Sequence, residues 1–195
     1  MAERLDDVDW DAYYDAITER EPREEVTRAI AAGRPGFAIE LGCGDGIDTQ
    51  ALAGAGWEVL AIDAEPASIR RVTSRMAGYP GVSTELARFE EITDLPPADL
   101  VVAAYTLPFC PPGAFDRLWS TIRGSLRGGG RFSGNFFGPN DTWAGSPGMT
   151  FHARSDLERL FDGFEIEVFT ETDEDGEATS GPKHWHLFSV MATVA

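Results

Sequence analysis

The sequence predicts an α/β fold in which a doubly wound, mostly parallel sheet of about seven strands is covered by helices. Short apolar runs alternate with helix-like stretches between residues 37 and 137, which is the pattern of parallel strands joined by crossover helices. The last two apolar runs have no helix between them, so they are expected to pair as an antiparallel hairpin. A glycine-rich loop directly follows the first run, at the edge where such sheets bind ligands.

Two helices are expected before the sheet. Apolar side chains recur at helical spacing in the first, and they are Val8, Trp10, Tyr13, Tyr14 and Ile17. In the second, Pro22 suits the first turn and Gly33 suits the end.

The remaining elements follow in order along the chain. The expected strands are Phe37–Leu41, Trp57–Ile62, Val82–Ala87, Leu100–Ala104 and Gly130–Phe137, and the helices between them are Ile47–Ala55, Ala67–Met76 and Ala114–Leu126. A short helix over Ser155–Phe161 precedes the last two strands, Phe164–Glu171 and Trp185–Val194. Between those strands, Asp173–Gly176 is expected to form a turn with a solvated run of charge.

The glycine loop is the most informative motif. Glu40 stands at the tip of the first strand, and Gly42, Gly44 and Gly46 follow it at alternate positions. Such a loop has little side-chain bulk, so its backbone can lie against a ligand at the start of the next helix. The dinucleotide fingerprint G-x-G-x-x-G is not matched, because its last glycine would fall at Ile47 or Thr49. The alternative is a tight turn that binds nothing.

Asp63 ends the second predicted strand, next to the glycine loop in a parallel sheet. A carboxylate at this place can accept hydrogen bonds from both hydroxyls of a ribose. The alternative is a helix cap, because Glu65-Pro66 follows and proline suits the first position of a helix.

The spacing E-x-G-x-G-x-G with Asp63 resembles the first motif of the class I S-adenosylmethionine-dependent methyltransferases, and the likeness covers nearly the whole chain after residue 33. It implies a single methyltransferase domain over 1–195, with a helical lid at 1–33 and a Rossmann-like core at 34–195. It also implies in-line transfer of a methyl group to an oxygen, sulfur, nitrogen or chalcogen atom of a small molecule. The short length and the N-terminal Trp10 and Tyr14 are similar to the tellurite-resistance-type methyltransferases.

The resemblance also implies which residues line the site. The cofactor-binding residues would be Glu40, Gly42, Cys43, Gly44, Asp45, Gly46, Asp63, Ala64, Phe89, Glu90, Ala104 and Tyr105, and the substrate-lining residues would be Trp10, Tyr14, Phe109 and Trp143. Phe89 and Glu90 would meet the adenine, and Ala104 and Tyr105 the methyl group. The tetrapeptide [ND]-P-P-[YF] is missing after the fourth strand, which disfavours N-methylation of amides or bases of that type.

His184 and His186 are the candidate catalytic residues. They stand two apart on a predicted strand, so both imidazoles face the same way. They are a base with its orienting partner, ordinary polar residues of a sheet face, or two metal ligands with His152 or Cys110 as a third. The family mostly needs no metal, and none is expected here.

Composition narrows the function classes. The formal net charge of −17, with Lys183 as the only lysine, disfavours nucleic acid or an anionic membrane as a partner. No apolar stretch has the length of a membrane span and the first ten residues do not form a signal peptide, so a cytoplasmic location is expected. Two cysteines make a disulfide framework improbable. The oligomeric state is left open.

The alternative functions are a nicotinamide-dependent oxidoreductase and a non-catalytic, cofactor-binding regulatory protein.

Overall fold

The computed structural model describes residue 14 and residues 20–178 and 181–195. The first predicted helix therefore lies outside the described residues, Trp10 included, except for Tyr14. The second is present as α2, Glu24–Ala32.

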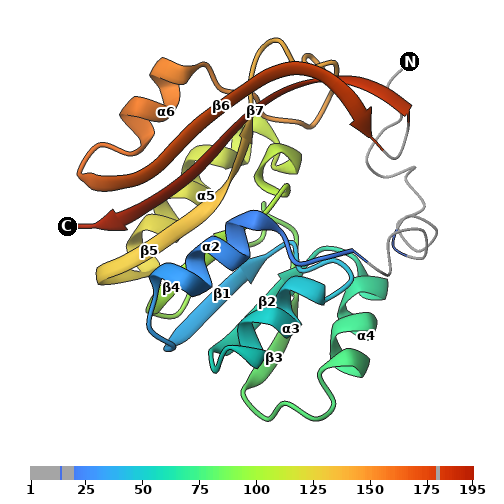
Figure 1. Cartoon of the computed structure of the whole chain (residues 1–195), viewed down its shortest axis with the longest axis vertical. Coiled ribbons are helices and arrows are strands. Elements are labelled where there is room, and N and C mark those ends of the chain that lie inside the picture. Colours follow the sequence, from blue (N-terminus) through green and yellow to red (C-terminus); the bar gives the residue numbers. More distant parts are fainter. Residues whose placement is uncertain (1–13, 15–19, 179–180) are drawn as a thin grey trace.

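Seven strands form one sheet in the order β3-β2-β1-β4-β5-β7-β6 (Figure 1). The strands are β1 Phe37–Leu41, β2 Glu58–Asp63, β3 Val82–Leu86, β4 Ala98–Ala103, β5 Leu126–Phe137, β6 Phe164–Ala178 and β7 Gly181–Val194. The first five pair in parallel, and β7 runs antiparallel to both β5 and β6. This confirms the predicted mixed sheet with an antiparallel hairpin at its end. Because the strand order reverses between β1 and β4, the ligand crevice of such a sheet lies at their carboxyl ends.

Helices cover both faces of the sheet, and a separate hydrophobic core lies between the sheet and the helices on each face. They are α3 Ile47–Gly54, α4 Pro66–Arg75, α5 Pro112–Ser125 and α6 Arg154–Leu160, with a 3₁₀ turn, η2, at Leu107–Phe109. Ile39 and Leu41 of β1 pack with residues of α5 and α6, whereas Ala38 packs with residues of α2, α3 and α4. Side chains alternate across a strand, which is why one short strand serves two cores.

The final hairpin is longer than expected. The prediction of a turn at Asp173–Gly176 is wrong, because β6 continues to Ala178 and pairs Asp173 with His186 and Asp175 with His184. The acidic residues are exposed, as expected of a solvated run, but they lie in a strand, where histidines opposite Asp173 and Asp175 stabilise the extension. We call residues 173–178 and 181–186 the hairpin arm. It extends beyond the last residue pair of β5 and β7, Phe137 and Leu187.

No helix in the described part of the chain combines the length and the apolar character that crossing a membrane requires.

Candidate active site

The glycine loop lies at the carboxyl end of β1 in a conformation that needs glycine. Gly42, Gly44 and Gly46 have φ values of 75°, 52° and 77°, where residues with a Cβ are strained. The Gly42 N–H donates to the carbonyl of Ile62 at 2.7 Å, which fixes the loop to the end of β2. A Cβ on Gly42 would lie 2.0 Å from Oγ1 of Thr106, in the segment after β4. The loop is therefore bare backbone packed closely against the segment after β4, with no room for a side chain at Gly42.

Asp63 belongs to the same unit as the loop. Its Oδ2 accepts the N–H of Gly44 at 2.9 Å, and its Oδ1 accepts the N–H of Glu65 at 2.8 Å. Burial raises the pKa of Asp63, against the lowering effect of these N–H donors. A carboxylate has about four acceptor positions, so Asp63 can hold the loop and the start of α4 and still accept hydroxyl donors. The cap alternative and the ribose alternative are thus compatible.

Buried acids surround the loop, and an arginine from outside the sheet compensates two of them. Arg20 donates to Asp45 at 2.9 Å and to Asp48 at 2.8 Å through Nη2. Glu40 is buried and accepts the hydroxyl hydrogen bond of Thr49. Burial, with a contribution from Asp48, raises the pKa of Glu40 well above its usual range. Glu40 therefore links β1 to Thr49 of α3, and Asp45 accepts the N–H of Ile47 at the start of α3.

The thiols near the site are not activated. Burial, with the nearby Glu40, raises the pKa of Cys43 well above its usual range. Burial also raises the pKa of Cys110 to about 12. A thiolate is the nucleophilic form of cysteine, so both side chains act as small apolar residues here.

Further candidates lie along the same edge. Ala64 follows β2 and Ala104 follows β4, both half-buried. Phe89 packs against the core beneath α5, whereas the Glu90 side chain is exposed and its carbonyl accepts a hydrogen bond from Arg117. The Tyr14 ring lies against the glycine loop, because a Cβ on Gly44 would be 2.9 Å from its Cε1.

Aromatic side chains gather beyond β4 and β5. Phe109 and Trp143 lie 6.4 Å apart between ring centroids, and Tyr105 and Trp185 lie 6.3 Å apart. All four are half-buried around a small core of Phe137, Met149 and Leu187. The sequence placed Phe109 and Trp143 on the substrate side, and the structure brings these two together. Trp10 lies outside the described residues.

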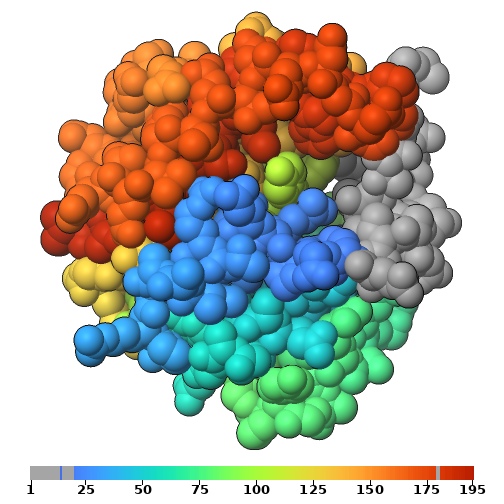
Figure 2. Space-filling view, viewed as in Figure 1, coloured from blue at the N-terminus to red at the C-terminus, as the bar shows by residue number. Residues whose placement is uncertain are grey.

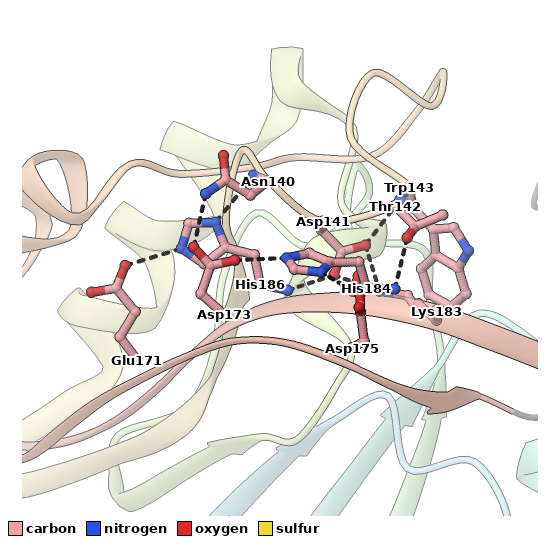
Figure 3. A network of polar contacts seen from close by, with 10 residues as sticks. All are labelled: Asn140, Asp141, Thr142, Trp143, Glu171, Asp173, Asp175, Lys183, His184 and His186. Carbon is pink, nitrogen blue, oxygen red and sulfur yellow. Dashed lines mark hydrogen bonds and ion pairs between the residues drawn. The ribbon is translucent and has the colours of Figure 1, made fainter.

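The two histidines of the arm have no free ring nitrogen. In His186, Nδ1 accepts the N–H of Asn140 at 3.0 Å and Nε2 contacts Glu171 at 3.0 Å. In His184, the two nitrogens contact Asp175 at 2.7 Å and Asp173 at 2.8 Å (Figure 3). A general base needs a free lone pair within reach of substrate. The geometry favours polar residues of the sheet over a base with its partner, and the catalytic role stays a prediction. Among the described residues, no group of three or more possible ligands is placed to hold a metal ion.

His184 and His152 should titrate at different pH values. Hydrogen bonds to Asp175 and Asp173 raise the pKa of His184 above 6.5, whereas burial lowers the pKa of His152 below that value. The stabilising contribution of His184 is present below pH 6.5 and disappears as the pH rises through its pKa in the folded protein; that of neutral His152 is lost on acidification. NMR titration of the ring protons measures both, with His184→Gln and His152→Gln as assignments. A His184 resonance that titrates at or below 6.5 contradicts the contacts described.

A buried ion pair links the hairpin arm to Asp141 in the loop after β5. The Lys183 ammonium contacts both carboxylate oxygens of Asp141, and the two side chains are 2% and 0% exposed. Lys183 Nζ also lies 3.9, 4.3 and 4.9 Å from the ring centroids of Trp185, Trp143 and Phe137. Figure 3 shows this pair beside the histidines of the arm.

Sequence reasoning did not identify the roles of Arg20, Thr106, Asn135 and Lys183. Their long-range partners leave no local signal, since Asp45 stands 25 residues from Arg20 and Glu25 stands 110 residues from Asn135. The one available signal was Lys183 itself, the only lysine in a strongly acidic chain.

Comparisons with known proteins bear on the family and the fold. Residues 39–132 match a family model described as a methyltransferase domain. None of the curated proteins matches the sequence.

Solved structures share the fold. TehB from Haemophilus influenzae has a TM-score of 0.81 at 16% identity, over 95% of this chain, which spans 66% of that protein chain. The N-methyltransferase NodS from Bradyrhizobium japonicum WM9 has a TM-score of 0.71 at 16% identity, over 97% of this chain and 99% of its own. A 1,6-didemethyltoxoflavin-N1-methyltransferase from Burkholderia thailandensis has a TM-score of 0.67 at 19% identity, over 95% of this chain and 84% of its own.

The sheet order, the bare-backbone loop after β1 and the family match point to one conclusion. The bare backbone at Gly42 and the acceptor oxygens of Asp63 fit S-adenosylmethionine, the cofactor of such domains. Residues 39–132 match a methyltransferase domain, and the sheet has the strand order of the class I S-adenosylmethionine-dependent methyltransferase fold.

Proposed function

We propose that this chain transfers the methyl group of S-adenosylmethionine to an oxygen, sulfur, nitrogen or chalcogen atom of a small molecule, as a single domain. The observation that carries the proposal is the unit formed by the glycine loop and Asp63, in which Oδ2 of Asp63 accepts the Gly44 N–H at 2.9 Å. When bound, the cofactor supplies a methyl group that its sulfonium has already activated for in-line displacement. Much of the rate can then come from alignment of the two reactants.

In this proposal the chain binds and aligns. The backbone of Gly42, Cys43, Gly44 and Gly46 faces the amino-acid end of the cofactor, with Glu40 and Asp45 beneath it. Asp63 and Ala64 face the ribose, Phe89 and Glu90 the adenine, and Ala104 and Tyr105 the methyl group. Phe109, Trp143 and Tyr14 enclose the acceptor, whereas Trp10 and most of the expected N-terminal lid lie outside the described residues. The aromatic side chains that pack around Phe137 support this side of the site.

Two observations support a small molecule as the methyl acceptor. The formal net charge of −17 works against a nucleic-acid acceptor, because a negative surface repels phosphate backbones. One structural neighbour was solved with 1,6-didemethyltoxoflavin and S-adenosylhomocysteine bound, and its fold is the fold of this chain. We therefore propose that the acceptor is a small molecule, and we leave its nucleophilic atom open.

Calorimetry tests the binding half of the proposal. S-adenosylmethionine and S-adenosylhomocysteine are expected to bind, and NADH is not. Tight NADH binding without a response to either methionine cofactor would favour a nicotinamide-dependent oxidoreductase. The catalytic half is tested by incubation with pooled small thiols, phenols, amines and selenite, with release of S-adenosylhomocysteine as the signal. No release above background from this panel would favour a non-catalytic binding protein.

Asp63→Ala should weaken the binding of S-adenosylmethionine. The change removes a charged acceptor, worth about 1.5–3 kcal/mol, which corresponds to a loss of affinity of roughly 10- to 150-fold. The Kd from calorimetry measures this, and urea unfolding shows how far the loop itself is weakened. Glu65→Gln is the matched control, because it removes a charge two positions away while the Glu65 N–H still donates to Asp63. Equal Kd values in wild type and Asp63→Ala would mean that the ribose lies elsewhere.

A further inference from the structure

Tyr105 has a strained backbone. Its φ of +58° is the one left-handed conformation that a residue other than glycine adopts in the described part of the chain. Strain of this kind persists only where surrounding contacts hold it, and it is frequent at ligand sites. Tyr105 comes directly after Ala104, at the carboxyl end of β4, where the sheet reverses its strand order. The contacts of Tyr105 therefore identify what holds it in place.

Asn135 on β5 holds the backbone of Tyr105. Its Oδ1 accepts the Tyr105 N–H at 3.1 Å, and its Nδ2 donates to Glu25 Oε1 at 2.7 Å and to Ser189 Oγ at 2.8 Å. Ser189 in turn donates to Glu25 Oε1 at 3.0 Å. Asn135 is 0% exposed and Glu25 is 3% exposed. Three elements that are distant in sequence, α2, β5 and β7, thus meet at one buried side chain.

The network allows only one orientation of the Asn135 amide. Oε1 of Glu25 accepts the hydroxyl of Ser189 and faces the amide nitrogen of Asn135, which donates to it. The amide oxygen is then left facing the Tyr105 N–H, which is a donor. A reversed amide would place two acceptors against each other on one side and two donors on the other. Glu25 therefore determines which atom Asn135 presents to Tyr105.

The ring of Tyr105 is fixed between two elements. The Arg23 guanidinium, at the start of α2, lies 4.8 Å from the ring centroid, and Trp185 of the hairpin arm meets the ring edge-on at 6.3 Å. In Figure 2 the blue segment that begins α2 and the orange-red hairpin face each other, with the lime-green segment after β4 visible between them. A change in the backbone of Tyr105 would withdraw the ring from both neighbours.

We propose that Asn135 and Glu25 are positioning residues, which hold Tyr105 against the methyl–sulfonium group of bound S-adenosylmethionine. This inference rests on the proposed function, because it uses the placement of Tyr105 at the methyl group. Glu25 orients Asn135, and Asn135 holds Tyr105 in a conformation that the residue would otherwise leave. The two cofactors differ only at this group, since S-adenosylhomocysteine lacks the methyl group and the positive charge.

The affinities of the two cofactors test the inference. Asn135→Ala should weaken S-adenosylmethionine binding about tenfold, the effect of one lost hydrogen-bonded contact, and S-adenosylhomocysteine binding less than about twofold. Calorimetry on the full chain measures both. Equal losses for the two cofactors, or no loss for either, would overturn the proposal.

Ser133→Ala is the matched control. Ser133 lies on the same strand and also binds Glu25, since its Oγ donates to the Glu25 carbonyl at 2.8 Å, but it has no hydrogen bond to Tyr105. The variant should leave the ratio of the two affinities unchanged. A ratio altered as much as in Asn135→Ala would mean that Asn135 only connects α2 to the sheet and does not act on Tyr105 specifically.

Ser189→Ala is the second variant, for the case that Asn135→Ala does not fold. It removes one of the two acceptors of the Asn135 amide and should shift the ratio of the two affinities in the same direction by a smaller factor. An unshifted ratio there also overturns the proposal.

A crystal structure of Asn135→Ala gives a readout that needs no cofactor. Tyr105 is expected to relax to a negative φ, and a φ that stays near +58° would show that Asn135 does not hold it. If the wild-type chain binds neither cofactor, the proposed function fails, whereas this structure still decides whether the network holds Tyr105. If the wild type binds both cofactors and the variant resembles Ser133→Ala, only the positioning role fails.

Discussion

Lys183→Met is expected to lower the free energy of unfolding by about 3–5 kcal/mol, the usual effect of removing one partner from a buried ion pair. The substitution leaves the Asp141 carboxylate, whose side chain is 0% exposed, without its counter-ion. The N–H groups of Trp143 and His186 still donate to it at 2.9 and 3.2 Å. These two donors prevent a larger loss, because they satisfy part of the carboxylate.

The aromatic surroundings of Lys183 sharpen this expectation. Its ammonium contacts Trp185, Trp143 and Phe137, and cation–π contacts of desolvated cations are worth about 2 kcal/mol or more. Methionine keeps much of the apolar volume and the contact with the rings, so the measured loss reports mainly the charge. Urea unfolding gives the free energy, and the m value shows whether the arm detaches separately.

A double variant separates the charge from the packing. Lys183→Met with Asp141→Asn removes both charges, and apolar or neutral replacement of a whole buried pair is often close to neutral. The double variant should therefore recover most of the stability that either single variant loses. Two equal single losses that simply add in the double variant would mean that the residues act independently.

The order of elements could be predicted from local pattern alone. β1 begins and ends at the predicted residues, Phe37 and Leu41, because a buried strand between Gly36 and Gly42 has clear limits. The glycine loop also follows from local pattern, since its chemistry depends on three nearby positions. Both rest on interactions between residues close together in the sequence.

The supporting contacts could not be predicted in this way. Glu25 and Asn135 are 110 residues apart, and Lys183 and Asp141 are 42 apart, so neither pair leaves a periodic signal. The local pattern at Asp173–Gly176 predicts a turn, because it does not show that His184 and His186 stand opposite Asp175 and Asp173 in the ladder. The pairing of two strands and its register decide which side chains stand opposite a charged residue.

Gly42→Ala is expected to weaken the binding of S-adenosylmethionine strongly while the protein still folds. The left-handed φ of 75° would cost alanine about 1–2 kcal/mol. In addition, the new Cβ would lie 2.0 Å from Thr106 Oγ1 and 2.6 Å from Thr106 Cβ, so the loop after β1 and the segment after β4 must move apart. Both segments belong to the proposed cofactor site. Calorimetry should therefore find S-adenosylmethionine binding at least about tenfold weaker, which is about 1.4 kcal/mol.

Two further variants make the result interpretable. Gly54→Ala at the end of α3 is the matched control, because no atom lies within 4 Å of its new Cβ; it should leave cofactor binding unchanged. Adding Thr106→Ala to Gly42→Ala removes the Oγ1 clash and leaves both the Cβ contact and the positive φ, so it should restore binding only in part. Full affinity in the single variant would show that the cofactor does not need a bare backbone at Gly42. Full recovery in the double variant would assign the whole effect to Thr106 Oγ1 and none to the backbone conformation.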